Sequence, residues 1–113
     1  RKEWELWSDK ATSFKAKDMM ELEKVRTVFF SDGGVTFTVT GLKGVVQTKS
    51  KDLRVEGDVV TRSSNGYIFR TQVLEYDSRA RQLRTTAAVE MSGPRDREGH
   101  SLRLSGVGME ASL

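Results

Sequence analysis

The sequence predicts an all-β fold: a twisted, folded antiparallel β-jelly roll built from stacked bent hairpins. Three observations carry this prediction. From Val35 onward, threonine, valine and aromatic residues alternate with polar residues at the two-residue period of a half-buried strand. Glycine, asparagine and aspartate interrupt this alternation as turn signals. A pattern of apolar residues also recurs three times with the same spacing, which indicates repeated hairpins.

The first third of the chain has the least regular pattern. Trp4 and Leu6 alternate with acidic residues and predict a short strand. Residues 14–25 fit either a weak helix or an irregular strand. We favour extended structure, because the β-forming residues 25–30 lead directly into the turn sequence of residues 31–34.

The remainder of the chain predicts a series of hairpins. From Leu53 to Val59, apolar residues or glycine alternate with charged residues, so one face of this strand is buried and the other is wet. The turn sequence of residues 63–66 ends the strand. The later strands are expected at residues 67–77, 83–91 and 100–111, with a turn at residues 77–81 and an exposed loop at residues 95–99.

An internal repeat predicts where these strands bend. Leu53-Arg54 and Val59 match Leu83-Arg84 and Val89 at a spacing of 30 residues. Three other strands each begin with a glycine, followed by apolar positions at intervals of two and then three residues. They are Gly34 with Phe37, Val39 and Leu42; Gly66 with Phe69, Thr71, Leu74 and Tyr76; and Gly99 with Leu102, Leu104, Val107 and Met109. A straight strand cannot change the parity of its inward face, so we expect a bulge or bend in the middle of each. Ordinary β periodicity is the alternative explanation.

Stacked bent hairpins would place two apolar walls opposite each other. Walls that stay apart would form a groove of roughly acyl-chain width, whereas walls that meet would form a dry core. Both arrangements require inward apolar residues, so the sequence leaves both open. The residues expected to face this interior are Phe37, Val39, Leu42, Val55, Val59, Phe69, Leu74, Tyr76, Val89, Leu102, Leu104, Val107 and Met109, with the small residues Gly57, Thr71, Thr85 and Ala87 between them.

Composition and motifs argue against an enzyme. The chain has no cysteine, which excludes disulfides and thiolate metal sites. His100 is the one histidine, and no sequence pattern supplies it with an orienting carboxylate or a nucleophile. Acidic residues are dispersed over outward strand positions without the clustering that a metal site needs. We therefore expect no catalytic residue, no metal and no cofactor. At 113 residues, we expect a single domain over residues 1–113, with residues 33–113 as its repeat region.

The charge pattern gives only a weak case for nucleic-acid binding. The net charge is +3, and the two signs are closely mixed. Small β-barrels that bind single strands combine cations with stacking aromatics on one face. Here the aromatic residues Phe37, Phe69 and Tyr76 are expected on the inward face and the arginines on the outward face. The stacking aromatics and the cations are therefore separated. The arginines expected on outward faces are Arg54, Arg62, Arg70, Arg84 and Arg103.

An open sheet has unpaired edges, to which another chain can add a strand. The last expected strand has no charged residue or proline at its centre that would prevent such pairing. We expect a docking edge there, for a second copy or for a partner of similar fold. Coverage of this edge by the N-terminal segment is the alternative. The residues of the expected edge are Leu104, Val107, Met109 and Ala111.

Five short motifs carry a family resemblance. They are Val-Glu-Gly-Asp-Val-Val from residue 55, Asn-Gly-Tyr-Ile-Phe-Arg-Thr from residue 65, Leu-Glu-Tyr-Asp from residue 74, Leu-Arg-Thr from residue 83 and Ser-Gly-Val-Gly-Met-Glu from residue 105. Together with Trp4 and Phe29-Phe30, they make the chain resemble the periplasmic lipopolysaccharide-transport proteins of the OstA-like group, and within it the LptC family. The likeness is good over residues 33–113 and loose over residues 1–32.

The resemblance implies a jelly roll whose interior receives the acyl chains of lipopolysaccharide, in the periplasm and without catalysis. It also implies an inner-membrane ABC transporter as one partner, and a soluble bridge protein of the same fold that receives the lipid at the C-terminal edge. The resemblance also implies a membrane helix. No apolar run here approaches the roughly 20 residues that span a bilayer, so we expect such a tether upstream of Arg1. Without it, the soluble bridge protein or a related export protein is the alternative. Carried onto this sequence, the groove positions are Phe37, Val39, Val59, Phe69, Thr71, Leu74 and Tyr76.

Overall fold

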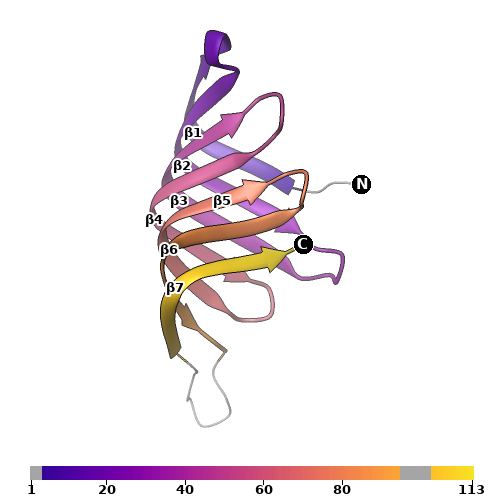
Figure 1. Cartoon of the computed structure of the whole chain (residues 1–113), viewed down its shortest axis with the longest axis vertical. Helices are drawn as coiled ribbons and strands as arrows, with labels where there is room; N and C mark the ends of the chain where they lie inside the picture. The colour runs from indigo at the N-terminus through magenta and orange to yellow at the C-terminus, as the bar shows by residue number, and fades with distance from the viewer. Residues whose placement is uncertain (1–3, 95–102) are drawn as a thin grey trace.

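The computed structural model describes residues 4–94 and 103–113, which form one antiparallel sheet of seven strands (Figure 1). The strands pair in chain order, each with its neighbours in the sequence. A short 3-10 turn, η1 (Lys15–Lys17), joins the first two. Among these residues no helix has the length and apolar character needed to cross a membrane. The strands are β1 (Trp4–Phe14), β2 (Met19–Phe30), β3 (Thr36–Gln47), β4 (Leu53–Ser63), β5 (Ile68–Asp77), β6 (Gln82–Ser92) and β7 (Arg103–Ser112).

The all-β prediction is confirmed, and so are the turns predicted within residues 31–34, 63–66 and 77–81. In the first third of the chain, extended structure is correct and the weak helix is wrong. The first strand is longer than the short one that was predicted, because β1 continues to Phe14. The predicted loop at residues 95–99, with His100 and Leu102, lies outside the described residues.

The sheet is folded along a line that crosses the middle of its strands. The register shifts between Thr40 and Lys43 on β3, and at corresponding places in the next three ladders. Figure 1 shows the strands curving there, so that turns from their opposite ends come to lie on the same side. We name the two halves by their turns: the first wing carries the turns at residues 31–35 and 64–67, and the second wing carries those at residues 15–18, 48–52 and 78–81. The predicted bend at the middle of the hairpins is therefore confirmed.

The bend is produced by additional residues in alternate strands. Between the pairs Glu56↔Val73 and Val59↔Thr71, β4 advances by one residue more than β5. Gly57 has a φ of 81° and Asp58 a φ of 46°, which is the left-handed backbone expected at a bulge. The ladder between β6 and β7 has the same kind of shift, between Thr85 and Ala88. The 30-residue repeat of the sequence thus corresponds to a repeat of bulged strands.

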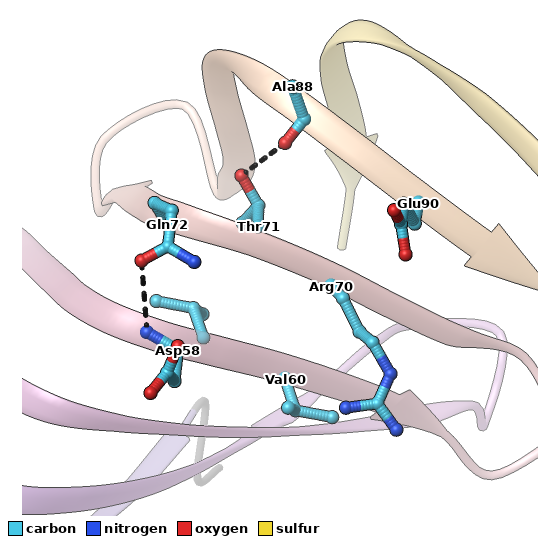
Figure 2. Close-up of a pocket in the computed structure, with 8 residues that line it drawn as sticks. Asp58, Val60, Arg70, Thr71, Gln72, Ala88 and Glu90 are labelled. Atoms are coloured by element: carbon cyan, nitrogen blue, oxygen red, sulfur yellow. Dashed lines mark hydrogen bonds between the residues drawn. The ribbon is translucent and has the colours of Figure 1, made fainter.

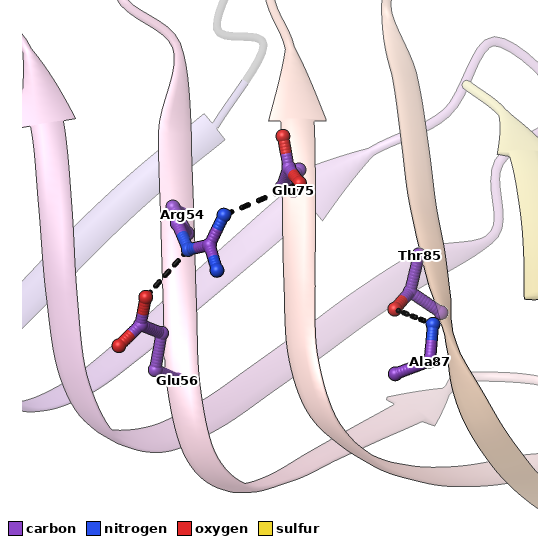
Figure 3. Close-up of polar contacts among 5 residues, drawn as sticks. All are labelled: Arg54, Glu56, Glu75, Thr85 and Ala87. Carbon is purple, nitrogen blue, oxygen red and sulfur yellow. Dashed lines mark hydrogen bonds and ion pairs between the residues drawn. The ribbon is translucent and has the colours of Figure 1, made fainter.

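Side chains satisfy backbone groups that the bulges leave outside the ladders. The Thr71 hydroxyl donates to the carbonyl of Ala88 over 2.8 Å, and the Asp58 amide donates to the side-chain oxygen of Gln72 (Figure 2). At the equivalent bend of β6, the amide of Ala87 donates to the hydroxyl of Thr85 (Figure 3). An unpaired polar group in a buried position would cost about 1–3 kcal/mol. The part-buried hydrogen bonds of Thr71 and Thr85 therefore contribute to the stability of the bend.

Two of the residues predicted to face inward, Leu42 and Val107, face outward instead. Leu42 is 54% exposed and Val107 is 81% exposed. In β3 the inward positions beside the bend belong to glycines: a Cβ on Gly41 would lie 2.3 Å from a methyl of Val55. In β7, Gly106 is the residue paired with buried Val89, which places Val107 on the other side. The prediction failed because it counted apolar side chains, and glycine occupies these inward positions without one.

The core lies between the two wings, inside the fold of the sheet. Its side chains come from five strands, β2 to β6, and no second layer of secondary structure covers them in the part of the chain described. The sheet therefore buries its apolar face against itself. The residues of the buried core cluster are Leu22, Val25, Phe29, Val39, Leu53, Val55, Val59, Leu74, Tyr76 and Leu83.

Candidate functional site

The predicted groove positions separate into two regions. Five of them lie in what we call the centre, the closed interior between the wings, and each is at most 7% exposed. The walls meet there: the space between Phe29, Val39, Leu74 and their neighbours leaves no room for a water molecule. In this conformation the centre is a packed core. The five central positions are Val39, Val59, Thr71, Leu74 and Tyr76.

The other two positions, Phe37 and Phe69, lie at what we call the mouth, an open hollow at one side of the fold. Both side chains are half-buried, and they help to line a hollow of about 520 Å³. The first wing contributes the turns at residues 31–33 and 63–67, and the second contributes the C-terminal residues 111–113. The mouth is therefore an apolar recess between the wings, with polar turns around it.

An aromatic cluster joins the wings next to the centre. The rings of Phe29 and Tyr76 lie 4.6 Å apart, and Trp4 lies 6.1 Å from each of them. Trp4 and Phe29 belong to the first wing, whereas Tyr76 belongs to the second. Offset aromatic pairs at these distances contribute about 0.5–1.5 kcal/mol beyond their buried area. Sequence reasoning assigned Tyr76 to the interior but did not identify Trp4 and Phe29 as its neighbours.

An ion pair connects the rims of the wings. A guanidinium nitrogen of Arg81, in the turn between β5 and β6, lies 3.4 Å from the carboxylate of Asp32, in the turn between β2 and β3. These turns end strands that are not adjacent in the sheet. Arg81 is mostly covered and Asp32 is mostly exposed, so the pair is worth less than about 1 kcal/mol. Its significance is its position across the opening between the wings.

Among the described strands, β1 and β7 are the two edges of the sheet, because they occupy the ends of the strand order. The predicted docking strand β7 pairs only with β6 among the described strands, so β1 does not cover it. Met109 and Ala111 are half-buried against the core, whereas Val107 projects into solvent. The side chain of Leu104 lies outside the described residues.

The convex face, which is the outer side of the folded sheet opposite the core, carries exposed charged residues, as the sequence predicted. Arg62, Arg70 and Arg84 are exposed on it, whereas the aromatic side chains of the interior lie on the other face. Arg54 contacts Glu56 on its own strand and lies 3.5 Å from Glu75 of β5 (Figure 3). Around Arg54, such alternating charges fit a solvated surface better than a nucleic-acid site, which needs stacking aromatics beside its cations. Trp7 is the described exception: it is 46% exposed, and the guanidinium of Arg26 lies 5.2 Å from its ring centre.

Chemically, the arrangement suits an apolar ligand better than a reaction. Among the described residues, no group of three or more His, Cys, Asp or Glu side chains could hold a metal ion, and His100 lies outside them. The inner face offers aliphatic and aromatic carbon, and buried threonine hydroxyls. A chain of methylenes entering from the mouth would pass its polar turns and then meet these apolar groups.

The whole sequence matches one family of known proteins. A family model described as "Lipopolysaccharide-assembly, LptC-related" matches residues 1–113. A search of curated proteins finds no match. The family model thus covers all seven strands, including the first third of the chain, where the sequence pattern was least regular.

Proposed function

The chain belongs to the LptC-related family of lipopolysaccharide-assembly proteins, and from this we propose that it binds lipopolysaccharide between its two wings and passes it on without catalysis. The family acts in lipopolysaccharide transport in the cell envelope, and it is a family of transport rather than of enzymes. The proposal adds the place of binding and the direction of transfer, from an inner-membrane transporter towards the outer membrane.

One observation carries the proposal: a single folded sheet encloses its own apolar face. Only side-chain contacts between the wings, and no hydrogen-bonded ladder among the described residues, hold the two walls together. Walls of this kind can separate without breaking a strand pair. Each methylene of an acyl chain that replaced those contacts would gain about 0.8 kcal/mol on leaving water.

In the proposed mechanism the lipid enters at the mouth. Phe37 and Phe69 are half-buried there, so they can contact a chain before the centre opens. Further entry requires the five central residues to replace their contacts across the interior by contacts with the lipid. These residues are Val39, Val59, Thr71, Leu74 and Tyr76. The aromatic cluster and the Arg81–Asp32 pair resist this separation, and the acyl chains compensate for it.

The partners and the location belong to the same proposal. We place the domain, taken as residues 1–113, in the periplasm, tethered to the inner membrane through a segment upstream of residue 1. It would receive lipid from an ABC transporter and deliver it at β7 to a soluble bridge protein of the same fold. The free edge of β7 supports this, because an unpaired strand can extend its sheet into a partner's.

Photo-crosslinking tests where the lipid lies. A benzophenone amino acid in place of Phe69 should capture lipopolysaccharide, whereas the same group in place of the neighbouring Arg70, on the exposed convex face, should not. Equal capture at both positions would contradict the proposed site. The matched pair differs by one residue along the strand and by the face of the sheet.

The same assay tests whether the wings must separate. Because the chain has no cysteine, Asp32→Cys and Arg81→Cys together can be joined across the opening by a short bismaleimide. The joined protein should capture several-fold less lipid at position 69 than either single-cysteine variant treated in the same way. Undiminished capture would mean that lipid enters without separation of the wings.

A structural module with a dry core is the second candidate, and the packed centre favours it. It predicts that Phe69→Asp unfolds the domain, since a buried unpaired carboxylate is costly. The lipid-binding proposal predicts instead that this variant keeps its fold and loses lipid capture, because Phe69 borders the open mouth. Circular dichroism and the crosslinking assay together distinguish the two.

A further inference from the structure

The lysines of the chain are concentrated at one end of the sheet. Seven of the eight lie in residues 10–24, which form the half of the β1–β2 hairpin from the bend to its end, or in residues 43–51, the adjoining half of β3 and the following turn. We call these two segments the lysine tip. They contain three acidic residues, so the tip has a net charge of +4, or +2 when the adjoining Asp9 and Asp52 are included, whereas the whole chain has +3. The rest of the molecule is therefore almost neutral, and its basic residues are mainly arginines.

The two segments form one continuous surface. Residues 19–23 of β2 pair with residues 43–47 of β3, and the amide of Thr48 donates to the carbonyl of Asp18 over 2.9 Å. Lys49 also forms an ion pair with Asp18 at 3.3 Å. The tip is thus a single patch, although it comes from two parts of the sequence.

The end of the hairpin projects from the body of the molecule. Every residue from 9 to 18 is exposed, and Figure 1 shows this hairpin forming one end of the long axis. Phe14 is 37% exposed at the end of β1, and the ammonium group of Lys17 lies 6.0 Å from the centre of its ring. A large apolar side chain is therefore partly exposed beside a cation at the end of β1.

From this we propose that the lysine tip docks on the surface of an anionic phospholipid bilayer. Lysine ammonium groups are attracted to the phosphates of such a surface, and their flexible stems need no fixed partner geometry. An exposed aromatic ring can enter the interfacial region beside them. A projecting tip can reach a flat surface, whereas the concave interior cannot. This contact is separate from the proposed binding of lipopolysaccharide between the wings, and it would orient the domain beside the membrane.

Three lysines of the tip suit a test by substitution. Lys10, Lys15 and Lys17 are exposed and form no ion pair among the described residues, so their replacement leaves no acidic partner alone. The test variant is Lys10→Gln, Lys15→Gln and Lys17→Gln in one chain. The matched control, Arg62→Gln, Arg70→Gln and Arg84→Gln, removes the same charge from the exposed convex face. Circular dichroism verifies that both variants fold.

Co-sedimentation with vesicles measures the binding. We expect the unaltered protein to bind vesicles of equal parts phosphatidylglycerol and phosphatidylcholine at low salt, and not vesicles of phosphatidylcholine alone. The lysine variant should bind roughly 100-fold more weakly, whereas the arginine control should lose less than about tenfold. Phe14→Ala should weaken binding by a few-fold, and added salt should weaken all binding.

Two results would overturn the proposal. One is the absence of binding to the phosphatidylglycerol vesicles, which would leave the tip as a solvated surface or as a site for another macromolecule. The other is an equal loss in the two triple variants, which would attribute binding to net charge alone. The vesicles contain no lipopolysaccharide, and the lysine variant should keep its capture at position 69. Failure of this proposal is thereby distinguishable from failure of the proposed transport function.

Discussion

The centre and the mouth of the folded sheet are built from the same strands, yet their side chains are packed differently. In the centre, Val39, Leu74 and Tyr76 are almost fully buried and leave no room for a water molecule. At the mouth, Phe37 and Phe69 line an open hollow of about 520 Å³. One inward-facing pattern thus supplies both a tightly packed interior and an open apolar hollow. The two regions should therefore respond differently to substitution.

The largest difference is expected from truncated side chains. Leu74→Ala removes a side chain that is 2% exposed and should lower the free energy of unfolding by about 2–5 kcal/mol. Phe69→Ala should cost less than half of that, because the half-buried ring already borders solvent. Urea denaturation measures both values. Equal losses would show that the mouth is packed as tightly as the centre, and the comparison would fail.

A smaller effect is expected from one added methyl group. Gly41→Ala would place a Cβ 2.3 Å from Val55, so overpacking should cost about 1–3 kcal/mol. Gly106→Ala, at the free edge, meets no atom within 4 Å and should change the free energy of unfolding by less than about 0.5 kcal/mol. Thermal unfolding of the two variants tests this. A well-tolerated Gly41→Ala would mean that the wings readily move apart at the bend.

The smallest effect concerns two buried threonines that the sequence does not distinguish. Thr71 donates a hydrogen bond to Ala88 at the bend, whereas the hydroxyl of Thr27 is buried without a hydrogen-bond partner among the described residues. Thr71→Val should therefore cost about 1 kcal/mol, and Thr27→Val should be neutral or slightly stabilising. Chemical denaturation under identical conditions resolves the difference. The opposite order would remove the role assigned to polar groups at the fold line.

The sequence predicted the inward face of a strand correctly only where no glycine occupies an inward position beside the bend. In β5 the intervals between Phe69, Thr71, Leu74 and Tyr76 predicted the inward face and its change of parity correctly, because a side chain occupies every inward position. In β3 and β7 the same intervals assigned Leu42 and Val107 to the wrong face, since glycines hold the inward places. A pattern of apolar residues cannot reveal an inward position that has no side chain.

The strands after residue 35, most of the turns, the bend and the charged outer face could be predicted from the sequence, because they follow from local alternation, turn residues and a repeat. Whether the apolar walls meet, which residues lie at the mouth and which groups join the wings depend on the tertiary structure. Phe29 meets Tyr76, and Asp32 meets Arg81, through contacts between residues far apart in the chain. Such contacts depend on how sharply the whole sheet folds, which is set by all of its bulges together and cannot be read from one strand.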